Sequence, residues 1–135
     1  MAENCIFCKI INNEIPSYTI YEDEDFKAIL DIQPSNPGHC VIITKAHRAN
    51  LFELEDELAA KVLPLAKKIG RRLKTALGCD GMNVLQNNGA ASGQTVWHYH
   101  IHLIPRWKED SVNISWVPSA HDSEAFGKLL EKIKL

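Results

Sequence analysis

Three histidines that alternate with apolar residues form the part of the sequence best suited to chemistry. The run 97–104 has histidine at positions 98, 100 and 102 and apolar residues at its odd positions. Side chains alternate between the two faces of a strand, so this pattern predicts a strand whose odd positions, from Trp97 to Leu103, pack inward. The three imidazoles then share the opposite face, about 6.6 Å apart. Because an unpaired buried imidazole costs free energy, three on one face indicate a functional site.

A loop of small residues, 87–95, precedes this histidine run. Small side chains allow backbone amides to approach an anion closely, as in phosphate-binding loops. Imidazole is nucleophilic and titrates near neutral pH, so it can attack phosphorus or donate a proton to a leaving group. Together these features favour phosphoryl or nucleotidyl transfer through a histidine intermediate. The alternative from the residues alone is a metal hydrolase whose histidines hold a catalytic zinc, although no acidic residue lies near the run to act as a base.

Two cysteines near the start of the chain, Cys5 and Cys8, form a CxxC motif. Such a motif is typical of a redox pair or of half a zinc site. A redox pair prefers a position between a strand and a helix, and no strand is expected before residue 5. Half a zinc site needs two more ligands, for which histidines are available.

The rest of the sequence predicts the elements that must position these residues. Alternating or continuous apolar runs predict strands over 18–22, 26–31, 39–44 and 82–86, and the second strand ends at Asp31, where a carboxylate commonly caps a turn. Helical spacing predicts a short helix over 9–14, a long helix over 54–77 that ends at Gly78, and a C-terminal helix over 122–133. Pro64 predicts a kink or a later start of the long helix. The basic residues in its last turns are interpreted as a solvated face. These elements predict a single α+β domain, 1–135, built on an antiparallel sheet of about five strands.

Composition limits the classes of function. The chain has 135 residues and a net charge of −2, so it carries no electrostatic footprint for nucleic acid. The N-terminal residues do not resemble a signal peptide, and no apolar run is long enough for a membrane span. We therefore expect a cytoplasmic protein with reduced cysteines, of which Cys40 and Cys79 are expected to be buried.

The histidine run and several upstream motifs resemble the histidine triad (HIT) superfamily. The matching motifs are Cys5-Ile6-Phe7-Cys8-Lys9-Ile10-Ile11, Glu14-Ile15-Pro16, Asp31-Ile32, Pro37-Gly38-His39, Asn87-Asn88-Gly89 and Gly93-Gln94-Thr95-Val96-Trp97-His98-Tyr99-His100-Ile101-His102-Leu103-Ile104. They cover residues 4–107 and leave 108–135 as a variable tail. The chain is most similar to the Hint branch, which contains nucleoside phosphoramidases of the zinc-binding CxxC type, and His102 differs from the glutamine of the galactose-1-phosphate uridylyltransferase branch.

The resemblance implies a homodimeric hydrolase of purine nucleotide derivatives whose two sheets join into one. It implies His100 as the nucleophile, His102 at the phosphate and leaving group, and His39 in the same pocket. Asp31 would bind the ribose. The remaining implied residues bind the α-phosphate (Asn87, Gly93, Gln94, Thr95) or form an apolar slot for the base (Ile6, Phe7, Ile10, Ile29, Ile32).

The resemblance also implies a structural zinc held by Cys5, Cys8, His47 and His98. Four protein ligands leave no open coordination position, so this zinc would not be catalytic. Two alternatives stay open: a dinucleoside polyphosphate hydrolase of the Fhit type, which usually lacks the CxxC, and a nucleotide-binding interaction protein with weak catalysis.

Overall fold

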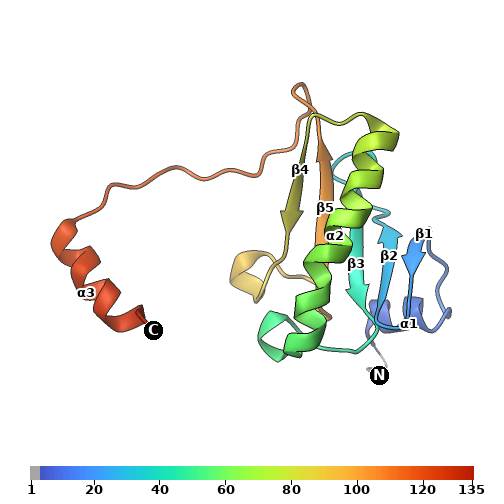
Figure 1. The fold of residues 1–135 in the computed structure, drawn as a ribbon, viewed down its shortest axis with the longest axis horizontal. Helices are drawn as coiled ribbons and strands as arrows, with labels where there is room; N and C mark the ends of the chain where they lie inside the picture. The colour runs from blue at the N-terminus through green and yellow to red at the C-terminus, as the bar shows by residue number, and fades with distance from the viewer. Residues whose placement is uncertain (1–3) are drawn as a thin grey trace.

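Five strands form one antiparallel sheet in the computed structural model, which describes residues 4–135. The order of the strands is β1-β2-β3-β5-β4, so the last strand in sequence lies between β3 and β4 (Figure 1). This confirms the predicted α+β class and the antiparallel sheet. The elements are α1 (Ile6–Ile11), β1 (Thr19–Glu22), β2 (Phe26–Leu30), β3 (Cys40–Thr44), α2 (Asp56–Leu77), β4 (Gly81–Leu85), β5 (His100–Arg106) and α3 (Ser123–Ile133), with short 3-10 turns at Leu51–Glu53 and Ala90–Ser92.

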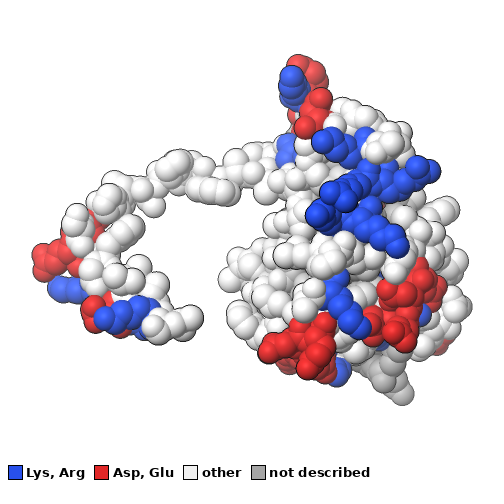
Figure 2. Space-filling model, in the orientation of Figure 1, with Lys and Arg blue, Asp and Glu red and all other residues white. Residues whose placement is uncertain are grey.

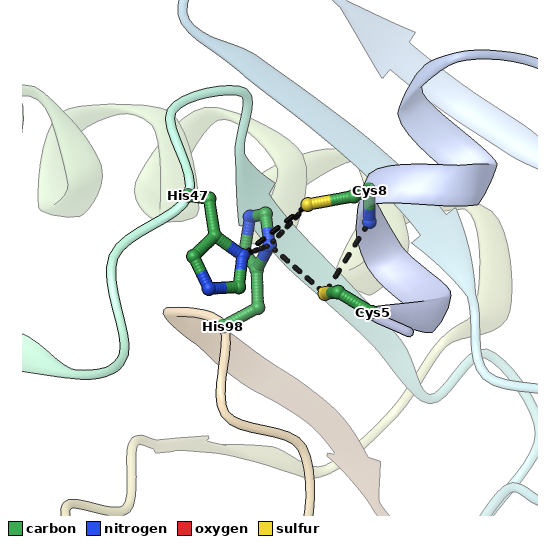
Figure 3. A group of neighbouring side chains, drawn as sticks. All are labelled: Cys5, Cys8, His47 and His98. Atoms are coloured by element: carbon green, nitrogen blue, oxygen red, sulfur yellow. Dashed lines mark hydrogen bonds between the residues drawn. The ribbon is translucent and has the colours of Figure 1, made fainter. Parts of the chain in front are cut away.

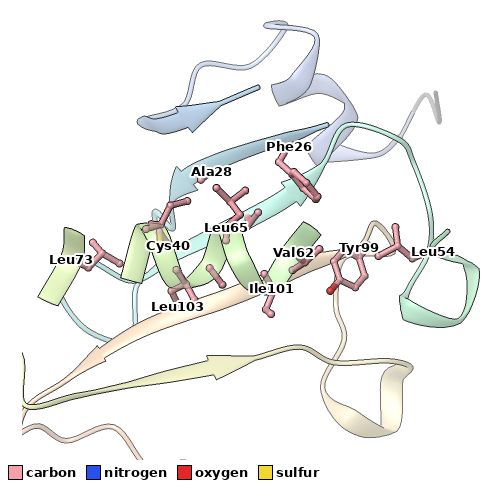
Figure 4. Close-up of a cluster of buried hydrophobic side chains, with 13 residues drawn as sticks. Phe26, Ala28, Cys40, Leu54, Val62, Leu65, Leu73, Tyr99, Ile101 and Leu103 are labelled. Atoms are coloured by element: carbon pink, nitrogen blue, oxygen red, sulfur yellow. The ribbon is translucent and has the colours of Figure 1, made fainter. Parts of the chain in front are cut away.

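Helix α2 covers one face of the sheet and forms the main core with it (Figure 4). Its apolar residues recur every three or four positions, which places one stripe against the strands. The predicted end of the helix is confirmed, because Gly78 adopts φ 63° and donates its backbone N–H to the carbonyl of Lys74. The core contains Phe26, Ala28, Cys40, Ile42, Leu54, Val62, Leu65, Ala66, Ile69, Leu73, Tyr99, Ile101 and Leu103.

Helix α1 packs on the other face of the sheet, where it forms a second, smaller cluster. Strands β3 and β5 pair so that Val41 lies opposite His102 and Ile43 lies opposite His100. Directly opposed residues of antiparallel strands share a face, so both histidines lie on the α1 side of the sheet. The buried members of this cluster are Ile10, Ile11, Ile29, Val41 and Ile43.

Three details of the sequence prediction are corrected. Strand β5 begins at His100, and the Trp97 side chain is 48% exposed, so the predicted inward packing of Trp97 is wrong. Helix α1 begins before residue 9, because the Cys5 side chain accepts a hydrogen bond from the Cys8 N–H and acts as its N-cap. Helix α2 runs through the exposed Pro64, so a start after that residue is wrong; the buried stripe on both sides stabilises the helix there.

The C-terminal part of the chain leaves the sheet. Residues 107–112 form a turn held at the sheet, where Asp110 accepts hydrogen bonds from Asn36 and Arg106. Residues 113–122 then extend away without regular structure, and α3 lies at the far end of this arm (Figure 1). The Asp122 side chain caps α3 by accepting from the Glu124 N–H, as the sequence predicts. Every residue of α3 is exposed, including its apolar residues Phe126, Leu129, Leu130 and Ile133.

Charged side chains gather on α2. Figure 2 shows a band of lysine and arginine over this helix, and the five cations of its C-terminal half are all exposed, which confirms the predicted solvated face: Lys67, Lys68, Arg71, Arg72 and Lys74. Among residues 4–135, no helix is both long enough and apolar enough to cross a lipid bilayer.

Candidate active site and metal centre

The three histidines of the run divide between two neighbouring sites. His100 and His102 lie on β5, with their ring centres 5.0 Å apart. His98 precedes the strand and is completely buried, and its ring faces Cys5 and Cys8 at the end of α1. The structure therefore brings His100 and His102 together on the sheet face and places His98 in a separate cluster beside them.

The proton of His100 is fixed by the backbone. His100 Nδ1 lies 2.7 Å from the carbonyl oxygen of His98, which can only accept a hydrogen bond. Nδ1 therefore carries the proton, and Nε2 keeps its lone pair. Burial also lowers the pKa of His100, which favours the neutral ring. The arrangement produces a neutral imidazole with a nucleophilic Nε2.

A chain of hydrogen bonds fixes the proton of His102. The Ser35 N–H donates to His39 Nδ1 at 3.0 Å, so the proton of a neutral His39 lies on Nε2. That nitrogen is 2.9 Å from His102 Nδ1 and 3.5 Å from Asp31 Oδ2. His102 Nδ1 is then the acceptor, and its Nε2 carries a proton that it can donate to a ligand. Burial, together with His100 and His39, lowers the pKa of His102 from 6.5 to about 4.

The same hydrogen bonds bear on the alternative of a catalytic metal. Asp31, His39 and His102 each offer a ligand atom, and these atoms lie within 4.8 Å of one another. His39 Nε2 carries a proton because Nδ1 already accepts from Ser35, so it has no lone pair for a metal. The donor set therefore fits a hydrogen-bond chain better than a metal centre.

The loop before β5 is held by one buried glutamine. Gln94 is 5% exposed; its Nε2 donates to the carbonyls of Ala49 and Val96, and its Oε1 accepts from the Gly89 N–H. All the polar atoms of this side chain therefore serve the loop. Gly93 has φ 103°, a conformation that side chains disfavour, and a Cβ there would lie 3.5 Å from Asn87 Nδ2. Gly93 and Thr95 are exposed, and Asn87 is half-buried.

The five residues of the expected base slot differ in exposure. Ile10 and Ile29 are buried in the small cluster beneath α1, whereas Ile6 and Ile32 are 46% and 79% exposed. Phe7 is half-buried and packs against that cluster. Asp31, at the end of β2, also accepts a hydrogen bond from the Gln33 N–H, so it caps the turn that the sequence indicated.

Cys5, Cys8, His47 and His98 converge from three segments of the chain (Figure 3). His98 Nδ1 lies 3.4 Å from Cys5 Sγ, 3.5 Å from Cys8 Sγ and 3.1 Å from His47 Nδ1. His47 Nδ1 lies 3.2 Å from Cys8 Sγ. A tetrahedral zinc with two sulfur and two nitrogen ligands has separations of about 3.3–3.8 Å between its ligand atoms. The separations of 3.1–3.5 Å are close to these values, so small movements of the four side chains give a tetrahedral Cys2His2 centre.

Neighbouring groups orient these ligands. His98 Nε2 donates to the carbonyl of Thr44 at 2.6 Å, which leaves Nδ1 without a proton and directed at the cysteines. Cys5 Sγ accepts a hydrogen bond from the Cys8 N–H, which fixes the position of its sulfur at the start of α1. Sequence reasoning had not identified Thr44 or Ser35, because both act through backbone atoms, which residue type does not reveal.

Comparisons with known proteins find a domain family, relatives and solved structures that match most of this chain. A model of the HIT domain matches residues 12–109. The adenosine 5'-monophosphoramidase HNT1 of Candida albicans is 43% identical over 137 residues, covering 97% of this chain and 90% of the relative. A solved structure from Streptococcus mutans is 40% identical with a TM-score of 0.95, covering 99% of this chain and 85% of that chain. A zinc-bound histidine triad family protein from Mycobacterium smegmatis is 37% identical with a TM-score of 0.78, covering 96% and 91%.

Proposed function

Because the chain belongs to the HIT domain family, we propose that it is a nucleotide-binding hydrolase of nucleoside 5'-monophosphate derivatives, adenosine phosphoramidates among them. The observation that carries the proposal is the hydrogen bond from His100 Nδ1 to the His98 carbonyl, which leaves Nε2 ready to attack phosphorus. Relatives named as adenosine 5'-monophosphoramidases support the substrate class.

In the first step, the lone pair of His100 Nε2 attacks the α-phosphorus. The phosphorus–nitrogen bond breaks, and the amine leaves with the bonding electron pair and takes up a proton from solvent. His100 becomes a nucleotidyl-imidazolium that keeps its Nδ1 proton and donates it in a hydrogen bond to the His98 carbonyl. The positive charge of this ring is stabilised by the carbonyl dipole.

In the second step, water attacks the same phosphorus, and the bond to His100 breaks with its electron pair returning to Nε2. The proton that water releases balances the one that the amine took up. His102 donates a hydrogen bond from Nε2 to the phosphate or the leaving group through both steps, and His39 holds it in this tautomer.

Residues around the histidines would bind the nucleotide. Asp31, which is partly exposed, would accept hydrogen bonds from the ribose hydroxyls. The phosphate would lie against Asn87, Gly93 and Thr95, while Gln94 shapes the loop through its three hydrogen bonds. The exposed Ile6 and Ile32 and the half-buried Phe7 would contact a purine base, with Ile10 and Ile29 supporting them from the small cluster.

We further propose that Cys5, Cys8, His47 and His98 hold a zinc ion. The support is the separation of the four ligand atoms and the zinc-bound relative. When bound, such a zinc supplies structural cross-linking, because four protein ligands leave no position for a substrate. Its thiolate ligands require a reducing compartment, which favours the cytoplasm.

A homodimer is the assembly that the open sheet edge favours. Strand β4 lies at one edge of the sheet, and beside it a groove between α2 and β4 exposes Leu63 and Val84. Pairing of β4 with the β4 of a second copy would satisfy the backbone groups of this edge and cover the groove. Each copy would be a single domain over 1–135, with 108–135 as its variable tail.

Turnover of an adenosine phosphoramidate, measured as AMP release, tests the proposed activity. We expect the purified protein to release AMP from it and to act much more slowly on diadenosine polyphosphates. Faster cleavage of the dinucleotides would favour the Fhit-type alternative. Binding of AMP without turnover of either substrate would favour the nucleotide-binding interaction protein.

A further inference from the structure

One residue belongs to both sites. The ring of His98 is part of the Cys2His2 cluster, where its Nδ1 faces the sulfur atoms of Cys5 and Cys8. The backbone carbonyl of the same residue accepts a hydrogen bond from His100 Nδ1. His98 is completely buried and is also anchored by its Nε2 to Thr44. Fixing this ring at both nitrogens therefore restrains the backbone of His98, whose carbonyl orients His100.

A second contact links the two sites. Phe7 lies between the two cysteines in sequence and is carried by α1. Its ring stands edge-on to the His100 ring, with centroids 4.9 Å apart at 71°, and edge-on to the His98 ring at 5.9 Å. Since Cys5 caps α1 and Cys8 lies in its first turn, holding both cysteines fixes the turn that carries Phe7.

We propose, on the basis of the function above, that the Cys2His2 centre positions the nucleophile His100 through the carbonyl of His98 and the ring of Phe7. The carbonyl selects the tautomer of His100, and the aromatic ring limits its rotation. His98 and Phe7 are thus positioning residues, and the centre acts on the reaction without touching the substrate.

The physical basis is the sensitivity of nucleophilic attack to geometry. A displacement of about 1 Å from the productive position can reduce a rate about a hundredfold. His100 has its Nδ1 bond on one side and the Phe7 edge on another, so a loosened α1 would release both constraints together. A purely structural centre, in contrast, would change stability and leave the ring of His100 as it is.

The tautomer of His100 can be read without substrate, by long-range proton–nitrogen NMR of the imidazole. In the zinc-loaded protein we expect one population protonated at Nδ1. In Cys5→Ser, which removes a ligand, we expect a mixture of tautomers or a broadened signal. Cys79→Ser, which removes a buried thiol outside the centre, is the matched control and should keep the single population. An unchanged His100 signal in folded, metal-free Cys5→Ser would overturn the proposal.

Phe7→Leu tests the second contact while keeping all four metal ligands. We expect its kcat to fall about tenfold or more, with a smaller change in KM and zinc retained. Leu65→Ala, remote in the main core, should lower the melting temperature without changing the His100 tautomer.

These measurements also separate the inference from the function on which it rests. If the wild-type protein does not cleave phosphoramidates but loses the single His100 tautomer with its metal, the proposed function fails and the coupling stands. If Phe7→Leu keeps both the wild-type kcat and the tautomer, the coupling through the ring is wrong whatever the substrate. Should Cys5→Ser fail to fold, Phe7→Leu decides the question.

Discussion

His100 and His102 have opposite tautomers because of their different backbone and side-chain partners. His100 donates from Nδ1 to a carbonyl, whereas His102 accepts at Nδ1 from His39. Two chemically identical side chains two residues apart therefore present a lone pair and a proton. This difference suits His100 for the proposed role of nucleophile and His102 for that of hydrogen-bond donor.

Replacing His100 should remove catalysis and spare binding. In His100→Asn we expect kcat to fall on the order of a thousandfold or more, since the attacking atom is lost. AMP should still bind, because Asp31 and the loop at 87–95 remain. Isothermal titration and single-turnover assays check the two halves of this expectation. A covalent adenylate trapped on another histidine would contradict the assignment.

Replacing Asp31 should affect ribose recognition. For Asp31→Asn we expect ribonucleotide binding to weaken by about 1.5–3 kcal/mol, the usual contribution of a hydrogen bond to a charged group. Binding of the 2',3'-dideoxy analogue should change little, because it lacks the hydroxyls. If binding of both ligands weakens equally, Asp31 does not recognise the ribose. Its role is then only to cap the turn, through the hydrogen bond that it accepts from the Gln33 N–H.

The lowered pKa of His102 predicts acid sensitivity. Burial, His100 and His39 lower this pKa to about 4, against the opposing effect of Asp31. An unfolded chain binds the proton near pH 6.5 and the folded chain only near pH 4, so stability is lost as pH falls through this window. Melting temperature measured against pH should therefore fall less steeply for His102→Asn than for the wild type. His121→Gln, at an exposed histidine of the arm, should keep the wild-type slope.

At the scale of elements, α1 depends on contacts outside itself. It has six residues, too few for a helix that is stable alone. The two cysteines hold its start, and the buried Lys27 donates to the carbonyl of Ile10 near its end. A metal at the first end would therefore complete the attachment of α1 to the sheet.

Metal removal should loosen α1 before the rest of the fold. We expect about one zinc per chain in protein purified without added metal, lost in Cys8→Ser. Chelation should lower the melting temperature and increase amide exchange in α1, while α2 stays protected. Hydrogen-exchange mass spectrometry resolves the two helices. Equal amide exchange in both helices after chelation, or a melting temperature that chelation leaves unchanged, would contradict the role of the metal in attaching α1.

The sequence predicted most elements because their periodicity is local. The stripe of α2 and the alternation from Tyr99 to Leu103 follow from spacing alone. The sequence did not predict that the strand begins at His100. The Tyr99 N–H donates to the carbonyl of Arg48 in a distant loop, and such a long-range bond is not encoded in local spacing. The contact of Phe7 with His100 was missed for the same reason: it depends on how α1 packs on the sheet, and spacing within α1 does not encode this.

At the scale of the whole molecule, the two edges of the sheet make a matched test of assembly. Val84 on β4 and Ile20 on β1 are 49% and 39% exposed. Val84→Lys should convert the proposed dimer to a monomer, because a charge on β4 would oppose extension of the sheet across this edge. Ile20→Lys, on the opposite edge, should remain a dimer. Sedimentation velocity distinguishes these outcomes; a monomeric wild type, or dissociation only by Ile20→Lys, would refute the β4 interface.

The position of β5 in the sheet affects how the protein is made. During synthesis the N-terminal strands and α2 leave the ribosome first, yet β3 and β4 do not pair with each other and join one sheet only when β5 enters between them. The same strand carries His100 and His102, and His98 lies two residues before it. A nascent chain therefore completes its sheet, the proposed Cys2His2 set and the proposed nucleophile almost together. A chain truncated before His98 has Cys5, Cys8 and His47 but lacks the fourth ligand, His100 and the strand that joins β3 to β4.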